Sequence, residues 1–252
     1  MQVPPYTLRQ KAAATAPDEP RHAGLTRAEL QRLLAGRHFA LAMQPVVRLA
    51  DRIPDHAEAL LRLRPPAGLP PLPAQRVIDA AAAFGLEPAL DAAVLHVAAT
   101  LPGHVSVNLC ARSLQHKPMV AVILAAGQAV EIVRAEAIDD LAAVAAAIAA
   151  LREGGITVAL DAVDGTAATL ACLQAARFDA MKLSGPVVHG ATSGGRGRDL
   201  LTHLLRLAAA TGATVIATRI ETLPQAWAMQ QAGVTLGQGW LFGAPGHAIV
   251  PS

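Results

Sequence analysis

Short apolar segments with the character of β-strands alternate with helical segments along most of this chain. The eight strand candidates cover residues 39–47, 56–63, 104–109, 129–133, 156–161, 179–183, 213–217 and 236–242. Helical patterns lie between most of them, over residues 74–85, 88–100, 138–153, 198–211 and 222–232. Eight strands that mostly alternate with helices are typical of an α/β chain folded as a (β/α)8 barrel.

The first two strand candidates are joined by a short connection, "RLADRIPD" (48–55). A crossover between parallel strands needs about a dozen residues or more. The sequence therefore predicts a TIM-like barrel whose first strand is antiparallel to the rest.

The two ends of the predicted domain differ in character. Residues 1–24 carry proline, alanine and mixed charge without periodicity, so we expect a disordered N-terminal arm followed by one domain over residues 25–252. The N-terminus has no apolar core like that of a secretory signal. The longest aliphatic run, 141–151, is shorter than the roughly 20 residues of a membrane span. These features predict a cytoplasmic protein without a membrane partner.

Composition narrows the functional classes. A net charge of +2 gives no electrostatic case for binding a nucleic acid polymer. Hydrophobic residues make up 53% of the chain but aromatic residues only 3%, so the core must be aliphatic and few rings are present to stack on a ligand. The two cysteines, Cys110 and Cys172, are predicted to be buried free thiols.

Single polar residues interrupt or end several of the apolar strands. Such a residue is costly in a buried strand unless it is paired or coordinated, and the active site of a barrel gathers at the C-terminal ends of its strands. Three carboxylates and an amide oxygen form a hard oxygen set, which suits Mg²⁺, Mn²⁺ or Ca²⁺ better than zinc. The residues concerned are Glu58, Asn108, Glu131, Asp161 and Lys182, followed by Glu221 and Gln238.

Short motifs around these residues resemble those of the EAL domain family, in the same order and at similar spacing. They are "MQPVV" (43–47), "EALLR" (58–62), "VSVNL" (105–109), "VEIV" (130–133), "VALD" (158–161), "MKL" (181–183), "IET" (220–222) and "QGWLFGAP" (238–245). The resemblance covers roughly residues 25 to 250. It implies a barrel with an antiparallel first strand and the hydrolysis of the bacterial second messenger cyclic di-GMP by two divalent ions.

The resemblance also implies roles for individual residues. Glu58, Asn108, Glu131 and Asp161 match the ligands of the first metal ion. Lys182 matches the lysine that steers the attacking water, while Glu221 and Gln238 match two further site positions. Arg62 matches an arginine that contacts the dinucleotide, and Gln44 is also retained as a ligand-binding residue.

Several positions depart from the family pattern. The family has two adjacent aspartates where this chain has Asp161 and Ala162, and Thr218 stands in place of the glutamate linked to the second metal and regarded as the general base. Arg134 replaces the glutamate that braces the catalytic loop, and Ser184 replaces an aspartate. The loop "DFGTG" is here "AVDGT" (162–166). These departures predict one ion site for Mg²⁺ or Mn²⁺, with Ca²⁺ as a further candidate, and loss of the second metal site.

Three functional hypotheses follow. The first is a catalytically inactive EAL domain that acts in cyclic di-GMP signalling as a receptor. The second is a regulatory module that binds a protein partner without using the nucleotide. The third is a weakly active phosphodiesterase that works with one ion. The sequence names no protein partner and leaves open whether the chain forms a homodimer.

Overall fold

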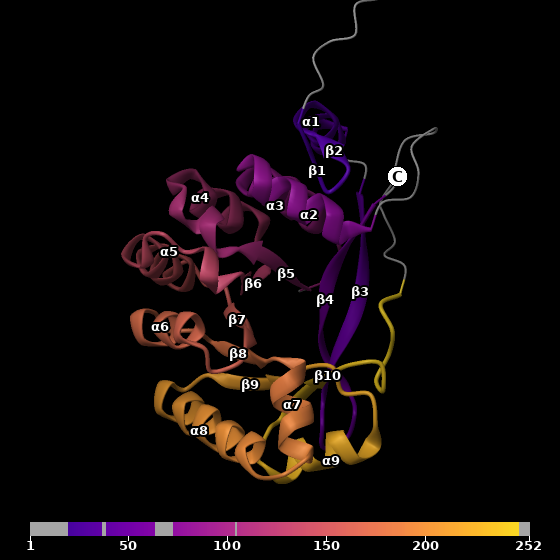
Figure 1. Ribbon diagram of the computed structural model, residues 1–252, viewed down its shortest axis with the longest axis vertical. Coiled ribbons are helices and arrows are strands. Elements are labelled where there is room, and N and C mark those ends of the chain that lie inside the picture. The colour runs from indigo at the N-terminus through magenta and orange to yellow at the C-terminus, as the bar shows by residue number, and fades with distance from the viewer. Residues whose placement is uncertain (1–19, 37–38, 64–72, 104, 247–252) are drawn as a thin grey trace, which may run out of the picture.

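The computed structural model describes residues 20–36, 39–63, 73–103 and 105–246. Eight strands close into a barrel in the order β10-β3-β4-β5-β6-β7-β8-β9 (Figure 1). The predicted fold class is therefore confirmed. The barrel strands are β3 (Phe39–Arg48), β4 (Pro54–Leu63), β5 (Val105–Cys110), β6 (Ala129–Val133), β7 (Val158–Val163), β8 (Ala180–Leu183), β9 (Thr214–Ala217) and β10 (Leu236–Gln238).

The first barrel strand, β3, runs antiparallel to both of its neighbours, β4 and β10, whereas the other pairs are parallel. The tight turn after β3 explains this geometry, because Arg48 N donates to Ile53 O at 3.0 Å and Arg52 adopts a left-handed φ of 60°. The long β3–β4 ladder places Gln44 directly opposite Glu58.

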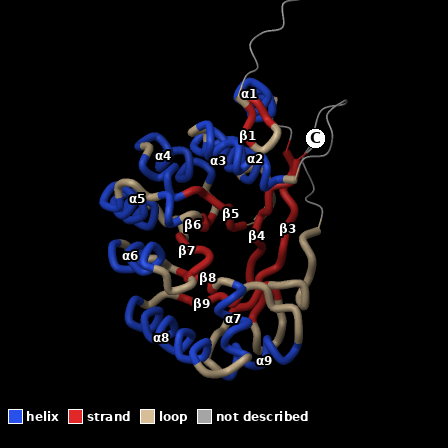
Figure 2. Tube along the Cα trace, viewed as in Figure 1, coloured by secondary structure: helices blue, strands red, loops and turns tan. Residues whose placement is uncertain are grey.

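Helices cover the outside of the barrel along β5 to β9, whereas most of β3 has no described helix beside it in this view (Figure 2). Five of them match predicted segments: α2 (Ala74–Phe84), α3 (Glu87–Ala98), α5 (Leu141–Glu153), α8 (Arg196–Thr211) and α9 (Leu223–Gln231). Four were not predicted: α1 (Arg27–Ala35), α4 (Lys117–Ala126), α6 (Ala167–Ala175) and α7 (Gly185–Thr192). Two short 3₁₀ helices, η1 (Ala111–Gln115) and η2 (Ala135–Ala137), follow β5 and β6.

A small hairpin precedes the barrel. Its strands β1 (Arg21–His22) and β2 (Leu25–Thr26) pair antiparallel, and Thr26 then caps α1 together with Glu29 in a capping box. Most of the predicted N-terminal arm lies outside the described residues, but Arg21 and His22 belong to it and pair with the predicted domain. The domain boundary itself remains a prediction.

The core is aliphatic, as composition requires. One large cluster of buried side chains fills the space between strands and helices, and a small separate cluster of Val46, Ala159, Ala180 and Ile216 lies on the barrel strands. Cys110 and Cys172 are both buried and free, as predicted. Within the described ranges, no helix has the length and apolar character needed to cross a membrane.

Candidate functional site

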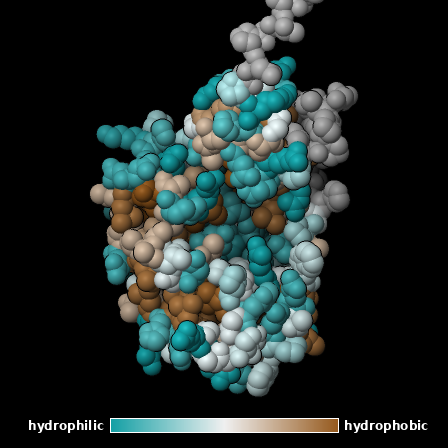
Figure 3. Space-filling view, in the orientation of Figure 1, coloured by the Kyte–Doolittle hydropathy of each residue, from teal (hydrophilic) through white to brown (hydrophobic). Residues whose placement is uncertain are grey.

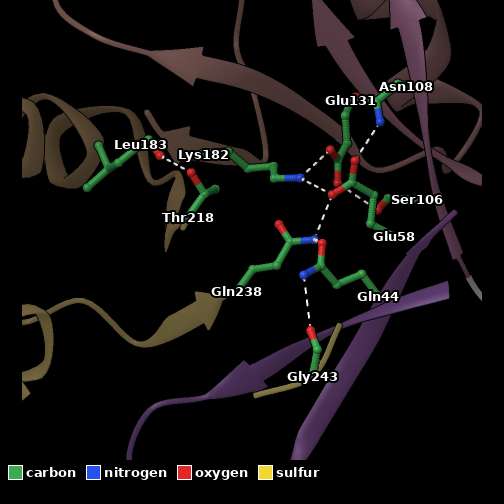
Figure 4. A network of polar contacts seen from close by, with 10 residues as sticks. All are labelled: Gln44, Glu58, Ser106, Asn108, Glu131, Lys182, Leu183, Thr218, Gln238 and Gly243. Carbon is green, nitrogen blue, oxygen red and sulfur yellow. Dashed lines mark hydrogen bonds and ion pairs between the residues drawn. The ribbon is translucent and has the colours of Figure 1, made fainter. Parts of the chain in front are cut away.

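A layer of polar side chains lies inside the barrel (Figure 4). Glu58 comes from β4, Glu131 from β6, Lys182 from β8 and Gln238 from β10, so every second strand along this part of the barrel contributes one of them. All four are buried; Lys182 is 2% exposed and Glu131 only 1%. Alternation of side chains along each strand turns these residues toward the interior rather than toward the helices.

Lys182 joins the two carboxylates. Its Nζ lies 2.7 Å from Glu58 Oε2 and also donates to Glu131 Oε2. Ser106 Oγ donates to the other oxygen of Glu131 at 2.6 Å. Each charge in this layer is therefore met by an opposite charge or a hydrogen-bond donor, as burial demands.

Glu58 receives two further hydrogen bonds. Asn108 Nδ2 donates to its Oε1, and Gln238 Nε2 donates to its Oε2 at 2.7 Å. Gln238 Nε2 also lies 3.4 Å from Gln44 Oε1, and Gln44 Nε2 donates to Gly243 O at 3.1 Å. Gln44 and Gln238 thus link Glu58 to the segment that follows β10.

The ionisation of these groups follows from burial and from one another. Burial raises the pKa of Glu58, but Lys182 and the amide donors outweigh it, so the pKa is lowered overall. Burial raises the pKa of Glu131 to about 7 despite the opposing effect of Lys182. Burial alone would lower the pKa of Lys182. The negative charges of Glu131, Glu58 and Asp161 raise this pKa by more than burial lowers it, so Lys182 stays charged.

A cleft of about 560 Å³ opens from this layer. Asp161, Thr218, Arg219, Glu221 and Trp240 line it together with Gln44, Glu58, Lys182 and Gln238. In the orientation of Figure 1, the space-filling view shows hydrophilic residues around a hollow near the centre of the visible face (Figure 3).

The members of the cleft wall differ in their environment. Burial raises the pKa of Asp161. Thr218 Oγ1 donates to Leu183 O at 2.7 Å, and Glu221 is exposed in the segment just before α9. Trp240 is 73% exposed.

Two predicted residues line a different cavity. Arg62 and Asn108 border a space of about 360 Å³ that also touches Arg134, and this cavity shares Leu60 with the main cleft. Arg62 Nη1 donates to the carbonyl of the preceding Leu61 at 2.9 Å. The structure therefore brings Gln44 and Gln238 together, but it places Arg62 beside them rather than among them.

Three non-glycine residues at this end of the barrel have left-handed backbone angles. They are Arg134 (φ 60°), Ala162 (φ 52°) and Arg219 (φ 55°), at or just beyond the ends of β6, β7 and β9. Such conformations cost about 1–3 kcal/mol each and cluster at functional sites. Arg134 and Ala162 are also among the positions expected from the sequence to depart from the family pattern.

Arg219 and Trp240 were not predicted from sequence. Arg219 lies between Thr218 and Ile220, in a stretch where the sequence indicates Glu221 as a site residue and Thr218 as a replaced position. Trp240 lies directly after Gly239, which packs so closely on the Ile220 backbone that an added Cβ would meet the Ile220 carbonyl oxygen at 2.1 Å. The glycine in "QGW" is the sequence signal for this close backbone contact, and it fixes the position of the tryptophan that follows.

The side chains present are of the kind that binds a single divalent cation, but two of the carboxylates are paired with Lys182. Within the described ranges, no three His, Cys, Asp or Glu side chains are disposed as a ready metal cluster, and the ammonium of Lys182 contacts both Glu58 and Glu131. The donors are nevertheless hard oxygen atoms, and one ammonium faces three carboxylates when Asp161 is included. Oxygen donors of this kind suit a cation of the Mg²⁺ type.

Comparison with known proteins agrees with this architecture. Cyclic di-GMP phosphodiesterase NbdA of Pseudomonas aeruginosa is 28% identical over 237 residues, covering 86% of this chain but only 30% of NbdA. The chain thus spans about a third of that relative. The structure of the PaMucR phosphodiesterase in complex with c-di-GMP is 20% identical with a TM-score of 0.75, covering 88% of this chain and 97% of the other.

A second solved structure, the FimX EAL domain from Pseudomonas aeruginosa bound to c-di-GMP, is 23% identical with a TM-score of 0.74. The alignment covers 87% of this chain and 95% of that one. The sequence profile of the EAL domain matches residues 27–245, which include every barrel strand and the whole polar layer. The chain therefore belongs to the EAL domain family.

Proposed function

We propose that this chain is a catalytically inactive EAL domain that binds cyclic di-GMP as a receptor. The observation that carries the proposal is the contrast between a connected polar layer and a rim of the same cleft that has no carboxylate at positions 162 and 218. Gln44, Gln238, Glu58 and Lys182 form one connected network. Beside it, Ala162 brings no carboxylate, and the hydroxyl of Thr218 is engaged with a backbone carbonyl.

Absence of hydrolysis follows from the chemistry of these two positions. A positioned general base typically contributes about 10²–10⁴-fold to a reaction rate, and a threonine hydroxyl cannot accept a proton as a carboxylate does. Without a carboxylate at Ala162 or Thr218, a second divalent ion has too few anionic ligands to repay its dehydration. The two deficits act on the same step and need not be additive.

Binding of the nucleotide is supported by other members of the cleft. Trp240 offers an exposed ring on which a guanine base can stack. Arg219 lines the same cleft, and no ion pair or hydrogen bond joins its guanidinium to another residue of the described ranges. Arginine recognises phosphate oxygens through two parallel hydrogen bonds. Arg62 offers a second guanidinium in the neighbouring cavity, which suits a ligand with two phosphodiester groups.

One divalent ion, Mg²⁺ or Mn²⁺ with Ca²⁺ as a further candidate, belongs to this proposal. Glu58, Asn108, Glu131 and Asp161 would hold it, and when bound it would neutralise phosphate charge. We also infer a cytoplasmic location, where a second messenger acts.

Weak phosphodiesterase activity is the second candidate. It is supported by the retained Lys182 beside the complete set of proposed metal ligands, and NbdA and PaMucR are both named as phosphodiesterases.

Calorimetric titration with cyclic di-GMP, with and without Mg²⁺, tests the receptor proposal. We expect saturable binding of one nucleotide per chain that is lost in Gln238→Leu, because this change removes a donor to Glu58 and the contact with Gln44. The matched control is Gln231→Leu, an exposed glutamine on α9 outside the cleft. No heat of binding under either condition would refute the receptor and leave a module that does not use the nucleotide.

A further inference from the structure

A groove separate from the cleft lies between α8 and α9, at the end of the molecule away from α1 (Figure 1). Its volume is about 630 Å³. The α8 wall carries two parallel rows of side chains, because residues four apart share one helix face. Leu201, Leu205 and Ala209 form the apolar row, and Arg198 and Arg206 lie at the two ends of the polar row.

The α9 wall presents Trp227, which is 65% exposed. Ala226 and Met229 of the same helix are buried against the molecule, so the neighbouring Trp227 is turned away from it. The chain has only two tryptophans, and the other one, Trp240, lies in the nucleotide cleft. Tryptophan and arginine are the residue types most enriched among binding hot spots, and this groove carries both.

The charge of the groove is of one sign. Arg198 and Arg206 line it, and no aspartate or glutamate does. Within the described part of the chain, neither guanidinium forms an ion pair or a side-chain hydrogen bond. A partner must therefore bring carboxylates to this surface, since complementary charge gives specificity and speeds encounter.

From these features we infer that the groove docks an acidic, amphipathic segment of a partner protein. An apolar side chain of that segment packs between Trp227 and the row of Leu201 and Leu205, as in the recognition of an amphipathic helix by a groove. Arg198 and Arg206 are eight residues apart on α8, or about 12 Å along its axis. A helical partner reaches both with carboxylates seven or eight residues apart. This docking surface does not depend on nucleotide binding.

Selection from a displayed random-peptide library against the full chain tests the inference. We expect the enriched peptides to carry two acidic residues separated by about two helical turns around an apolar anchor. Binding of a labelled synthetic copy should fall at least about tenfold in Arg198→Glu and in Arg206→Glu. The matched control Arg32→Glu changes an exposed arginine on α1, far from the groove, and should bind as the unaltered protein does.

Burial of Trp227 gives an independent readout. In a Trp240→Phe background Trp227 is the sole tryptophan, and the peptide should shift its fluorescence to shorter wavelength. Enriched peptides without acidic residues, no enrichment at all, or binding that survives both charge reversals would overturn the inference. Self-association that is lost in Trp227→Ser would also overturn it, because it would assign the groove to a second copy of this chain.

Discussion

The ammonium of Lys182 lies 2.7 Å from the carboxylate of Glu58 in the interior of the barrel, and it also contacts Glu131. These three residues come from β8, β4 and β6, so the two ion pairs connect strands that are not neighbours in the sheet. Removing the cation from such a set leaves buried negative charge without compensation. The stability of the barrel therefore depends on the charge balance of this buried layer.

Replacing Lys182 by Met should destabilise the fold by about 3–5 kcal/mol, because two buried carboxylates lose their counter-ion. Urea unfolding measures the loss. The control is Lys117→Met, an exposed lysine at the start of α4, which should change the free energy of unfolding by no more than about 0.5 kcal/mol. Mn²⁺ should restore stability to Lys182→Met more than it stabilises the unaltered protein. A variant that is as stable as the control and indifferent to Mn²⁺ would show that the ion pairs have no such role.

Asp91 on α3 should make stability depend on pH. Burial raises its pKa to about 7, although Ser113 Oγ and Cys110 N both donate to it. Since this folded-state pKa lies above the unfolded value of 3.8, the folded protein holds the proton more tightly. The resulting stability is complete below pH 3.8 and is lost as pH rises through about 7.

The variant Asp91→Asn keeps an acceptor for both donors but does not titrate. Relative to the unaltered protein, its free energy of unfolding should rise between pH 4 and pH 8, by up to roughly 4 kcal/mol. Denaturant titrations of both proteins at a series of pH values give this difference directly. A difference that is constant with pH would mean that Asp91 is ionised in the folded state.

Trp240 should contribute to nucleotide affinity by stacking. Trp240→Ala should weaken cyclic di-GMP binding by about 1–3 kcal/mol, the usual contribution of one stacked base. Trp227→Ala removes the other exposed tryptophan and should leave nucleotide affinity unchanged. Equal losses in both variants would indicate an indirect effect on the fold.

Restoring two carboxylates should restore some hydrolysis. The double replacement Ala162→Asp and Thr218→Glu returns a general base and second-ion ligands to the rim, and together these contribute at least about 10²-fold. Chromatography of the linear dinucleotide in Mn²⁺ measures the gain, with Asp161→Asn added to the double variant as the inactive control. No gain would indicate that residues 163–166, which the double variant leaves unchanged, limit the reaction instead.

Most of the barrel could be predicted from the sequence because its strands carry a strong local signal. The eight apolar segments all form strands, and the short connection after β3 fixes its antiparallel direction through the reach of the chain. The missed helices α4 and α6 are apolar on most sides, so periodicity could not separate them from strands or loops. The capping box of Thr26 and Glu29 is the sequence signal for the start of α1.

The sequence could indicate which polar residues lie together inside the barrel, but not how they pair. Polar residues inside apolar strands pointed to Glu58, Glu131 and Lys182, and the structure joins them. Sequence could not reveal that Lys182 lies between the two carboxylates, because side-chain pairing across a barrel depends on strand stagger. It also could not place Arg62 in the neighbouring cavity, because that depends on the direction of its side chain at the end of β4.

The most direct test of the central claim is one incubation of the purified chain with cyclic di-GMP and Mn²⁺, in which bound nucleotide and product are both measured. Equilibrium dialysis gives the bound fraction, and chromatography of the same sample gives any linear dinucleotide. We predict saturable binding with recovery of intact cyclic di-GMP. Turnover near one per second that is abolished by Glu58→Ala would contradict the account and establish an active phosphodiesterase.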